Sequence, residues 1–549
     1  MKLQKILSNG SNNNLVDPIV NTKSGHVEGF LMNTVKGPIN VFLGIPYAEP
    51  PLGDLRFKKT VPVKAWSGIK MCKRYNNRPQ QNDFFWESLV LKTRKSEDCL
   101  YLNIMAPSWK PDNEEAGFSV LFYIHGGGYV CDSAARYGYR DISKLVVAKN
   151  VVVVTIEYRL GYLGFLCTGD ENCKGNFGLW DQVTALQWVY DNIKFFGGNP
   201  RRITVSGQSA GATSADLLAL SPYSRDLVKQ TLLMGGTAES SWSVCKVEEI
   251  IEYCKRHAER LGWRGGTSAE MVDFLRRVPA SKLGDGMIGN KTIFKTATLP
   301  LGPVIDGELL PKSVDELRAE ATSKPTLVGV CQSEGLLFTA LGGMKCNKKD
   351  IYDGLDLISC AIKDLKIDLN AAVKEIYIKG DLEDMNRQTV QRIFVDMLDD
   401  LVTNFSSTNF VEKMVEKNAN VYMYCLEYCN PVSFGILTFL MPFVAATHGS
   451  ELTYLFNVNP FASPFRRNRN DRKVTDIFTT VCTNFIKTGD PNIGNGSNSH
   501  DVLGFKWEPV SKDTDYYLSV APKCQLKKNF KDGRLKRLRQ ILGISRISL

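Results

Sequence analysis

A serine in a glycine-rich turn, Gly207-Gln208-Ser209-Ala210-Gly211, is the strongest chemical signal in this chain. The β-rich residues 201–206 lead into the turn, and the helix-forming residues 212–218 leave it. A serine hydroxyl is a poor nucleophile unless a base takes its proton and its oxygen stands clear of the backbone. A sharp strand-to-helix turn exposes the oxygen, and small flanking residues let strand and helix approach closely. The pattern therefore predicts a nucleophilic Ser209.

Elimination among the five histidines selects His448 as the general base. His26 precedes the main strands, His257 lies on a charged helical surface, His500 lies in an Asn/Ser/Gly-rich loop, and His125 heads a glycine run. His448 lies in residues 445–451, downstream of a strand and beside a glycine, where a loop can carry it to the serine. The alternative is a hydrogen-bonded structural histidine.

Three consecutive glycines, residues 126–128, follow the apolar run Phe118 to Ile124. Without Cβ atoms, their N–H groups can converge on one point, as a developing oxyanion requires. We assign the N–H groups of Gly127, Gly128 and Ala210 to this oxyanion hole. One such donor stabilises a transition state by about 3 kcal/mol. The alternative is a tight turn without a catalytic role.

The acid that would orient the base has three candidates. Glu334 directly follows the apolar run 326–330, between the serine and the histidine in chain order. Asp306 and Glu308 also lie in that interval, but they follow a proline and have the pattern of turn residues. From the residues alone, all three remain candidates.

The elements around these residues predict an α/β protein with a large, mostly parallel twisted sheet. Residues 118–124 and 151–156 are short, apolar and β-branched, as expected for strands buried on both faces. Further strand candidates are residues 203–205, 231–234, 326–330 and 421–426. Residues 176–196 have helical spacing and end at two glycines, and similar patterns between the strands predict helices on both faces. Residues 25–29 and 41–44 suggest an antiparallel β start.

Length and composition suggest one large domain in a chain of 549 residues. We expect a disordered segment at residues 1–16, a single domain at 17–522 and a basic helix or tail at 523–549. This last segment carries nine Lys or Arg residues against one acid, and residues 530–544 can form an amphipathic helix that buries Leu535, Leu538, Ile541 and Leu542. Its basic face could be merely solvated, or could bind an anionic membrane surface or an acidic partner.

Other sequence features limit the expected cellular location and the expected partners. The N-terminus lacks a signal-length apolar region, no stretch of about 18 apolar residues suggests a membrane span, and several cysteines lie within apolar runs. We therefore expect a cytoplasmic protein with mostly reduced thiols and no integral membrane segment. No nucleic-acid motif is present, no His/Cys cluster has metal-ligand spacing, and the glycine runs fit no phosphate loop, so we predict no nucleic-acid partner, metal or cofactor. The oligomeric state is not determined by these features.

Several stretches together closely resemble the type-B carboxylesterase and cholinesterase branch of the α/β-hydrolases. They are residues 42–53, 96–103, 125–129, 161–165, 175–182 and 488–492, together with the serine turn, the Glu334 segment and His448-Gly-Ser-Glu451. The resemblance covers about residues 17–520. It implies the α/β-hydrolase fold and a Ser209–Glu334–His448 triad, and it is the resemblance that favours Glu334 over Asp306.

Some positions depart from the family pattern. Gln208 replaces the glutamate that usually precedes the serine, which removes a charge and should weaken attraction for cationic substrates. Gly235 and Gly236 stand where relatives often carry a serine–glycine pair, so a hydrogen bond to the acid could be lost. Cys72 and Cys99 match the family's first disulfide, which in a cytosolic chain could instead stay reduced.

The resemblance implies a serine esterase that acts on small or lipophilic carboxylic esters through an acyl-enzyme. A cholinesterase-like enzyme is an alternative, with Trp86 as a candidate for binding a quaternary ammonium, although its offset from the Ser96–Cys99 motif favours a core or rim position. Trp242 is a candidate for the acyl pocket, against ordinary core packing. A non-catalytic adhesion or scaffold relative is the second alternative, opposed by the presence of all three triad residue types.

Overall fold

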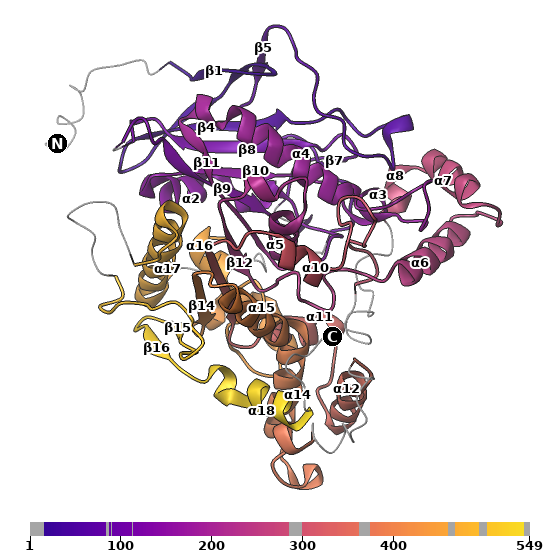
Figure 1. The fold of residues 1–549 in the computed structure, drawn as a ribbon, viewed down its shortest axis with the longest axis vertical. Coiled ribbons are helices and arrows are strands. Elements are labelled where there is room, and N and C mark those ends of the chain that lie inside the picture. The colour runs from indigo at the N-terminus through magenta and orange to yellow at the C-terminus, as the bar shows by residue number, and fades with distance from the viewer. Residues whose placement is uncertain are drawn as a thin grey trace, which may run out of the picture.

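Runs of β-branched and aromatic residues form one large mixed sheet, which crosses the molecule in Figure 1. The computed structural model describes residues 16–83, 87–88, 91–111, 113–284, 299–361, 374–458, 467–492 and 502–542. Within these residues the sheet has eleven strands in the order β16-β15-β14-β13-β12-β11-β9-β10-β8-β4-β3. Their bounds are β3 Phe30–Asn33, β4 Pro38–Pro46, β8 Tyr101–Pro107, β9 Phe118–Ile124, β10 Val151–Ile156, β11 Gly198–Gln208, β12 Gln230–Met234, β13 Thr326–Cys331, β14 Val421–Leu426, β15 Tyr517–Val520 and β16 Gln525–Lys527.

The centre of this sheet is parallel and its margins are antiparallel. Strands β10, β9, β11, β12, β13, β14 and β15 pair in parallel. The antiparallel pairs are β3 with β4, β4 with β8, β8 with β10, and β15 with β16. The predicted mostly parallel sheet with an antiparallel start is therefore confirmed.

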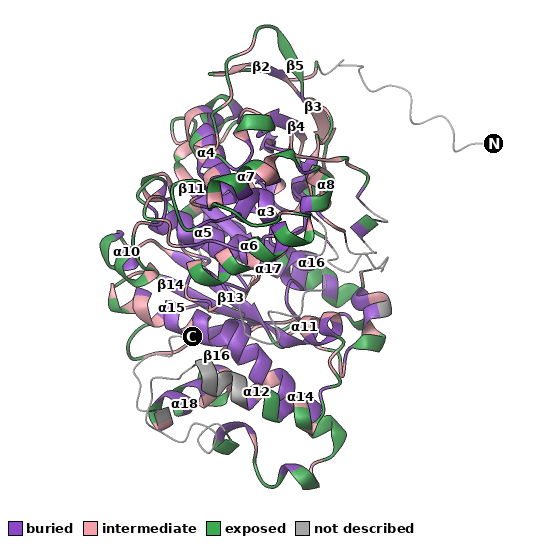
Figure 2. Cartoon of the chain, turned by 90° about the vertical axis from the view of Figure 1, so that its right-hand side faces the viewer, coloured by how far each residue is buried: buried purple, intermediate pink, exposed green. Residues whose placement is uncertain are grey.

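Both faces of the sheet are buried, because side chains alternate between two apolar cores. Along β9, Val120 and Phe122 belong to one core, whereas Leu121 and Tyr123 belong to the other. The first core includes residues of helices α4 (Phe177–Asn192) and α5 (Ala210–Leu220). The second core includes residues of α17 (Arg469–Thr488) and of the segment around α2 (Tyr139–Leu145). Figure 2 shows the buried strands among these helices, and α5 is buried along its whole length.

Smaller elements lie around this frame. A three-stranded sheet contains β1 (Ile19–Thr22), β2 (Gly25–Glu28) and β5 (Ile69–Met71), and β6 (Arg78–Pro79) pairs with β7 (Lys95–Ser96). The further α-helices are α3 Gly161–Phe165, α6 Val247–Arg260, α7 Ser268–Arg277, α8 Ala280–Leu283, α10 Val314–Glu320, α11 Gly335–Gly342, α12 Lys348–Ala361, α14 Arg387–Asp399, α15 Phe405–Glu416, α16 Glu451–Leu455 and α18 Arg534–Leu542. In the described part of the chain, no helix is long and apolar enough to cross a bilayer.

Short helical turns complete the described elements. The 3-10 turns are η1 Gly53–Leu55, η2 Ala134–Tyr137, η3 Val147–Lys149, η4 Ile193–Phe196, η5 Arg225–Leu227, η6 Leu382–Asp384, η8 Pro431–Leu440 and η9 Phe530–Gly533. Segment η7 (Asp400–Asn404) is a π-helical turn that joins α14 to α15. π-Helical turns often occur at functional sites, because the extra residue redirects neighbouring side chains.

The candidate catalytic residues all follow strands of the parallel centre. Ser209 follows β11, the glycine run follows β9, Glu334 follows β13, and His448 lies on the long connection after β14. Because parallel strands end at the same edge of a sheet, the fold brings these four segments to one edge.

Candidate active site

Ser209 occupies a strained turn between β11 and α5. Its backbone has φ 58° and ψ −127°, a conformation that non-glycine residues rarely adopt. The Ser209 N–H donates to the Met234 carbonyl at 2.8 Å, which ties the turn to the neighbouring strand β12. Ser209 itself is half-buried, whereas Gln208 and Ala210 on either side are buried. The turn thus lifts one side chain out of a buried backbone.

The glycines beside Ser209 are required by close backbone contacts. A Cβ on Gly207 would lie 2.2 Å from the Gly211 carbonyl, and one on Gly211 would lie 2.2 Å from the Ile124 oxygen. Real Cβ atoms do not approach backbone this closely, so a side chain at either position would push strand and helix apart. The expectation that small residues let the two elements approach is confirmed.

The glycine run after β9 packs directly against the serine turn. A Cβ on Gly126 would lie 2.5 Å from the Gln208 carbonyl oxygen, and Gly127 and Gly128 have φ of 92° and 60°. In the described part of the chain, the N–H groups of Gly127 and Gly128 have no hydrogen-bond acceptor. Ala210 opens α5, so its N–H has no partner within the helix. All three donors are available to an incoming oxygen.

Glu334 and His448 meet although 114 positions separate them in the chain. Glu334 Oε2 lies 2.5 Å from His448 Nδ1, and Glu334 Oε1 accepts the Cys331 N–H at 2.6 Å. Both side chains are buried. Burial lowers the pKa of the His448 imidazole, but the charge and hydrogen bond of Glu334 outweigh it, so the net pKa is raised. The contact holds the ring in one orientation and favours its cation.

The other imidazole nitrogen contacts the residue next to the serine. Gln208 Nε2 lies 3.2 Å from His448 Nε2. With the amide donating, His448 Nε2 is an acceptor and the imidazole proton lies on Nδ1, facing Glu334. Among the described residues, the Ser209 hydroxyl has no hydrogen-bond partner. In this state the amide contacts the nitrogen that would take the serine proton.

Gly235 explains how the ring is packed. This residue has φ 62°, and a Cβ on it would lie 3.2 Å from His448 Nδ1 and 3.4 Å from Gln208 Nε2. Having no side chain, it offers no hydrogen bond to Glu334, as the departure from the family pattern implied. The Cys331 N–H binds the oxygen of Glu334 that does not contact the ring.

A second buried glutamate, Glu451, lies behind the acid and was not identified from the sequence. Its Oε2 accepts the Cys331 thiol at 2.8 Å, and its Oε1 has no partner among the described residues. Burial, together with the charge of Glu334, raises the pKa of Glu451 to about 7. The available signal was an acid directly before the mostly apolar stretch Leu452 to Phe456.

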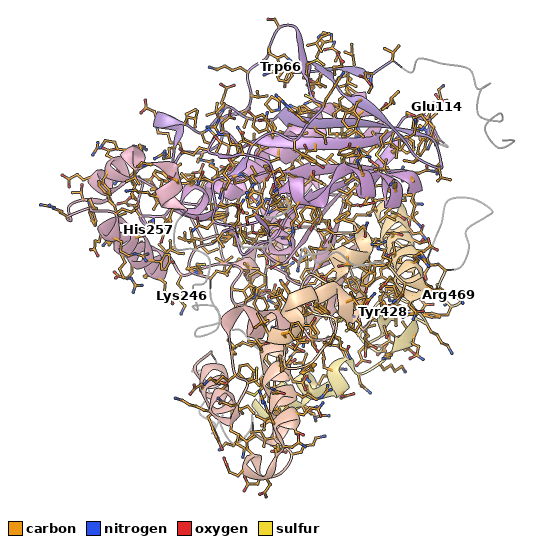
Figure 3. All side chains as sticks on the ribbon, turned by 180° about the vertical axis from the view of Figure 1, so that it is seen from behind. Trp66, Glu114, Lys246, His257, Tyr428 and Arg469 are labelled. Carbon is orange, nitrogen blue, oxygen red and sulfur yellow. The ribbon has the colours of Figure 1, made fainter. Side chains whose placement is uncertain are left out.

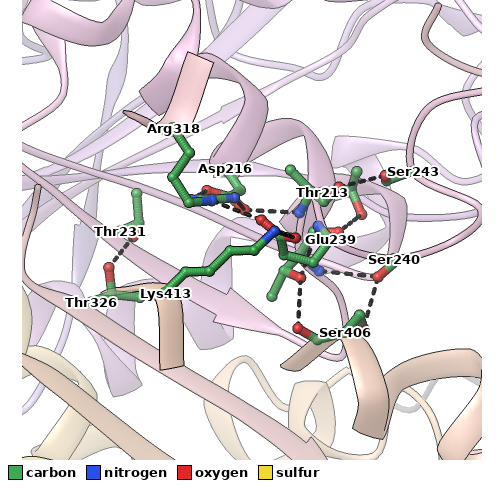
Figure 4. Close-up of polar contacts among 12 residues, drawn as sticks. Thr213, Asp216, Thr231, Glu239, Ser240, Ser243, Arg318, Thr326, Ser406 and Lys413 are labelled. Atoms are coloured by element: carbon green, nitrogen blue, oxygen red, sulfur yellow. Dashed lines mark hydrogen bonds and ion pairs between the residues drawn. The ribbon is translucent and has the colours of Figure 1, made fainter. Parts of the chain in front are cut away.

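An ion cluster holds the nucleophile helix from its far side (Figure 4). Arg318 on α10 binds Asp216 of α5 at 2.8 Å and Glu239 at 2.8 Å, and Glu239 also pairs with Lys413 of α15. Asp216 accepts the Ala238 N–H at 2.8 Å, which anchors the loop after β12. These contacts fix α5 to the loop that carries Trp242.

Trp242 is buried beside the serine turn. Its indole N–H donates to the Val402 carbonyl at 2.8 Å, and its ring would lie 3.0 Å from a Cβ on Gly236. A Cβ on Gly236 would also lie 2.8 Å from the Ser209 carbonyl. The other tryptophan candidate, Trp86, lies outside the described residues.

The rival acids form a turn, as their pattern predicted. Asp306 Oδ1 accepts the N–H groups of Glu308 and Leu310, and Glu308 pairs with Lys59. The structure therefore gives both residues partners other than His448. The two cysteines of the family's first disulfide, Cys72 and Cys99, are separate buried thiols here.

The remaining histidines have other surroundings. His125 is buried, with Nε2 3.7 Å from Glu157 Oε2, and burial lowers its pKa. His257 is buried and stacks on Tyr162 at 3.8 Å between ring centroids, so its assignment to a charged helical surface was wrong. Figure 3 shows His257 in the lobe formed by α6 and α7. His26 lies on β2, and His500 is outside the described residues.

Comparison with known proteins agrees with this geometry. A sequence model described as the Carboxylesterase family matches residues 16–538. Esterase cest-33 of Caenorhabditis elegans is 36% identical, over 92% of this chain and 91% of that protein. Bile salt-activated lipase of Bos taurus is 31% identical, over 91% of this chain and 83% of the lipase. Neuroligin-2 of Homo sapiens is also 31% identical, over 94% of this chain and 67% of the neuroligin.

The match spans the central sheet, the serine turn and the contact between Glu334 and His448. This chain belongs to the carboxylesterase family, and it is a hydrolase that acts on esters.

Proposed function

We propose that ester hydrolysis in this protein proceeds through an acyl-enzyme on Ser209, with His448 as general base and Glu334 as the acid that orients it. The observation that carries the proposal is the 2.5 Å contact between Glu334 and His448 at the same edge of the sheet as the strained Ser209 turn. A buried carboxylate bonded to Nδ1 leaves the other nitrogen with a lone pair, as proton removal from a hydroxyl requires.

In the first half of the cycle, Ser209 Oγ attacks the ester carbonyl carbon while its proton passes to His448 Nε2. Collapse of the tetrahedral intermediate breaks the bond to the alcohol oxygen, which takes that proton from His448. A water molecule then attacks the acyl-enzyme by the same proton transfers, releasing the carboxylic acid and restoring Ser209.

Negative charge develops on the former carbonyl oxygen in both tetrahedral intermediates. The N–H groups of Gly127, Gly128 and Ala210, for which the described residues supply no acceptor, are the donors proposed to stabilise it. Because these donors belong to loops in backbone contact with the Ser209 turn, they need little reorganisation during the reaction.

The same site supports a proposal about substrates. A neutral amide, Gln208, adjoins the serine and contacts His448, so the position next to the nucleophile carries no charge that would attract a cationic alcohol group. We propose small or lipophilic neutral carboxylic esters as substrates, with Trp242 beside the acyl group. In the reacting complex, Ser209 Oγ takes the place of the Gln208 amide at His448 Nε2, since apo contacts of catalytic groups often rearrange on binding.

A second candidate is a binding protein without turnover. The likeness to Neuroligin-2 favours it, as does a Ser209 hydroxyl that has no hydrogen-bond partner among the described residues. The intact Glu334–His448 contact favours the enzyme. The cytoplasmic location stays a prediction from the sequence.

The decisive experiment incubates the purified protein with p-nitrophenyl esters of increasing acyl length. The Ser209→Ala variant should lose about 10⁴- to 10⁶-fold of the turnover and should no longer react with a fluorophosphonate probe. Ser214→Ala, on the same helix, is the matched control and should retain both properties. A wild-type protein that neither turns over any ester nor reacts with the probe would support the binding protein.

A further inference from the structure

Much of the charge of the basic C-terminal segment is paired with acids of this same chain. Within the part of the segment that the structure describes, five of its nine Lys and Arg residues form ion pairs with acids from other parts of the chain. These pairs are Lys527–Glu427, Lys531–Asp399, Arg534–Asp400, Lys536–Asp515 and Arg539–Glu412. Leu535 and Leu538 are buried as the amphipathic pattern predicted, and Figure 1 shows α18 beside α14. The segment therefore docks on its own chain.

The main docking point is a pair of consecutive acids at the π-helical turn, Asp399 and Asp400. Both side chains are fully buried. Asp400 binds Arg534 at 2.6 and 2.8 Å and accepts the Tyr377 hydroxyl at 2.8 Å. Asp399 turns the other way and accepts the Gly335 N–H at 2.7 Å. Gly335 is the residue directly after Glu334.

Lys531 is linked to the acid loop, residues 332–335, on both sides of Glu334. Its ammonium group donates to the carbonyl of Gln332, two residues before the glutamate, and lies 3.4 Å from Asp399 Oδ2. Asp399 in turn holds the residue after the glutamate. One cation thus connects to the backbone that precedes Glu334 and, through a carboxylate, to the backbone that follows it.

The backbone that carries this lysine is itself strained. Lys531 and Asp532 have φ of 53° and 54°, values that side chains other than glycine rarely adopt. Such conformations persist only where surrounding contacts determine them. Here the surroundings are Phe530, buried against Tyr517 at 5.3 Å between ring centroids, and Arg534, bound to Asp400.

From these contacts we propose that Lys531 and Asp399 are positioning residues that hold Glu334 in place against His448. The proposal rests on the proposed function, because it concerns the same triad. It makes the segment from Phe530 to Arg534 part of the support of the active site, and it explains why Asp399 and Asp400 face different partners.

Charge gives Lys531 a second role at this point. Burial raises the pKa of Asp399 to about 8, and the ammonium of Lys531 acts against this shift. Without the lysine, the carboxyl would be neutral over a wider range of pH, and a neutral acid binds the Gly335 N–H less strongly than a carboxylate.

The test compares Lys531→Met with Lys536→Met in the full-length protein. Lys536 lies in the same segment and loses an exposed ion pair with Asp515, so this control removes an equal charge away from the acid loop. Lys531→Met should lower kcat about 10- to 100-fold, with KM changed far less, because Glu334 would no longer fix the imidazole. Lys531→Arg, which keeps the cation, should restore part of the loss.

A spectroscopic readout reports the positioning itself. The proton between Glu334 and His448 should give a far-downfield resonance in the wild type and in Lys536→Met, and this resonance should shift or broaden in Lys531→Met and in Asp399→Asn. The measurement needs no turnover, so it remains valid if the wild type hydrolyses no ester. Should either Lys531→Met or Asp399→Asn fold with the kcat and the resonance of Lys536→Met, the positioning role would be wrong while the triad would stand.

Discussion

Two groups of buried carboxylates in this molecule, one behind α5 and one at the candidate active site, have different partners. In the ion cluster behind α5, Asp216 and Glu239 form ion pairs with Arg318 and Lys413 (Figure 4). At the candidate active site, Glu334 faces an imidazole, and Glu451 faces a thiol. The first region is neutralised by cations and holds elements together. In the second region, the carboxylate charge is balanced by binding of a proton, as acid–base chemistry requires.

The largest expected effect is a loss of activity when the acid of the active site is substituted. Glu334→Gln should reduce kcat by about 10⁴-fold, because an amide would favour the wrong imidazole tautomer and would not stabilise the imidazolium. The unfolding midpoint should change little, since the substitution conserves shape. Steady-state kinetics and thermal unfolding of the same preparation measure both quantities. Retention of more than a tenth of wild-type kcat would contradict the role of Glu334.

The converse change, in the ion cluster, should act on stability. Arg318→Met leaves Asp216 without its cation, and breaking a buried pair in this way costs about 3–5 kcal/mol. Denaturant unfolding measures the loss. The control is Arg256→Met, which removes an ion pair that is 63% and 61% exposed and should cost less than about 1 kcal/mol. Equal losses in the two variants would show that the cluster is not a structural support.

Glu451 should make stability depend on pH with a predictable sign. Its pKa is raised in the folded protein to about 7, so the wild type is favoured below the unfolded value of about 4.3 and loses that advantage as pH rises through 7. Glu451→Gln does not titrate, so it should gain stability relative to the wild type between pH 5 and 8, by at most about 3 kcal/mol. Exposed Glu114→Gln should show no such trend. If Glu451→Gln lost stability relative to the wild type, or kept a constant difference from it, as pH rose from 5 to 8, this account would be wrong.

The smallest expected effect comes from Gln208→Glu, which adds a carboxylate to the active site. Gln208→Glu places a carboxylate 3.2 Å from the imidazole, where the amide now lies, and should raise the pKa of His448 further. Because protonated His448 cannot act as a base, the acidic limb of the kcat/KM profile should move to higher pH by roughly one pH unit. Gln187→Glu adds the same charge on the exposed face of α4 and should leave the limb in place. Cationic esters should gain relative to neutral ones only in Gln208→Glu.

Local patterns predicted the frame well and the network around the acid poorly. The runs 118–124, 151–156 and 421–426 coincide with β9, β10 and β14, because strands buried on both faces leave a continuous apolar signature. His448 could be selected because the chain has few histidines. Glu334 needed the resemblance, since spacing alone did not separate it from Asp306.

Such local patterns could not predict contacts between residues that are distant in the chain. Asp399 and Lys531 lie 132 positions apart, and nothing in the sequence around either residue indicates the other. His257 was misplaced for a different reason. It lies on the same face of α6 as Ile250 and Cys254, and this helical spacing would have shown that it points inward despite its charged neighbours.

The backbone contact between Gly211 and Ile124 has a consequence for how this enzyme could be controlled. It joins the nucleophile turn and the oxyanion loop into one unit, so neither can shift without the other. His448 and Glu334 instead lie on separate connections, which follow β14 and β13 respectively. Heat, ligands or modification that tune activity without unfolding the sheet should therefore act through the C-terminal half of the chain, and hydrogen exchange should find amides there opening before those of the Ser209 turn.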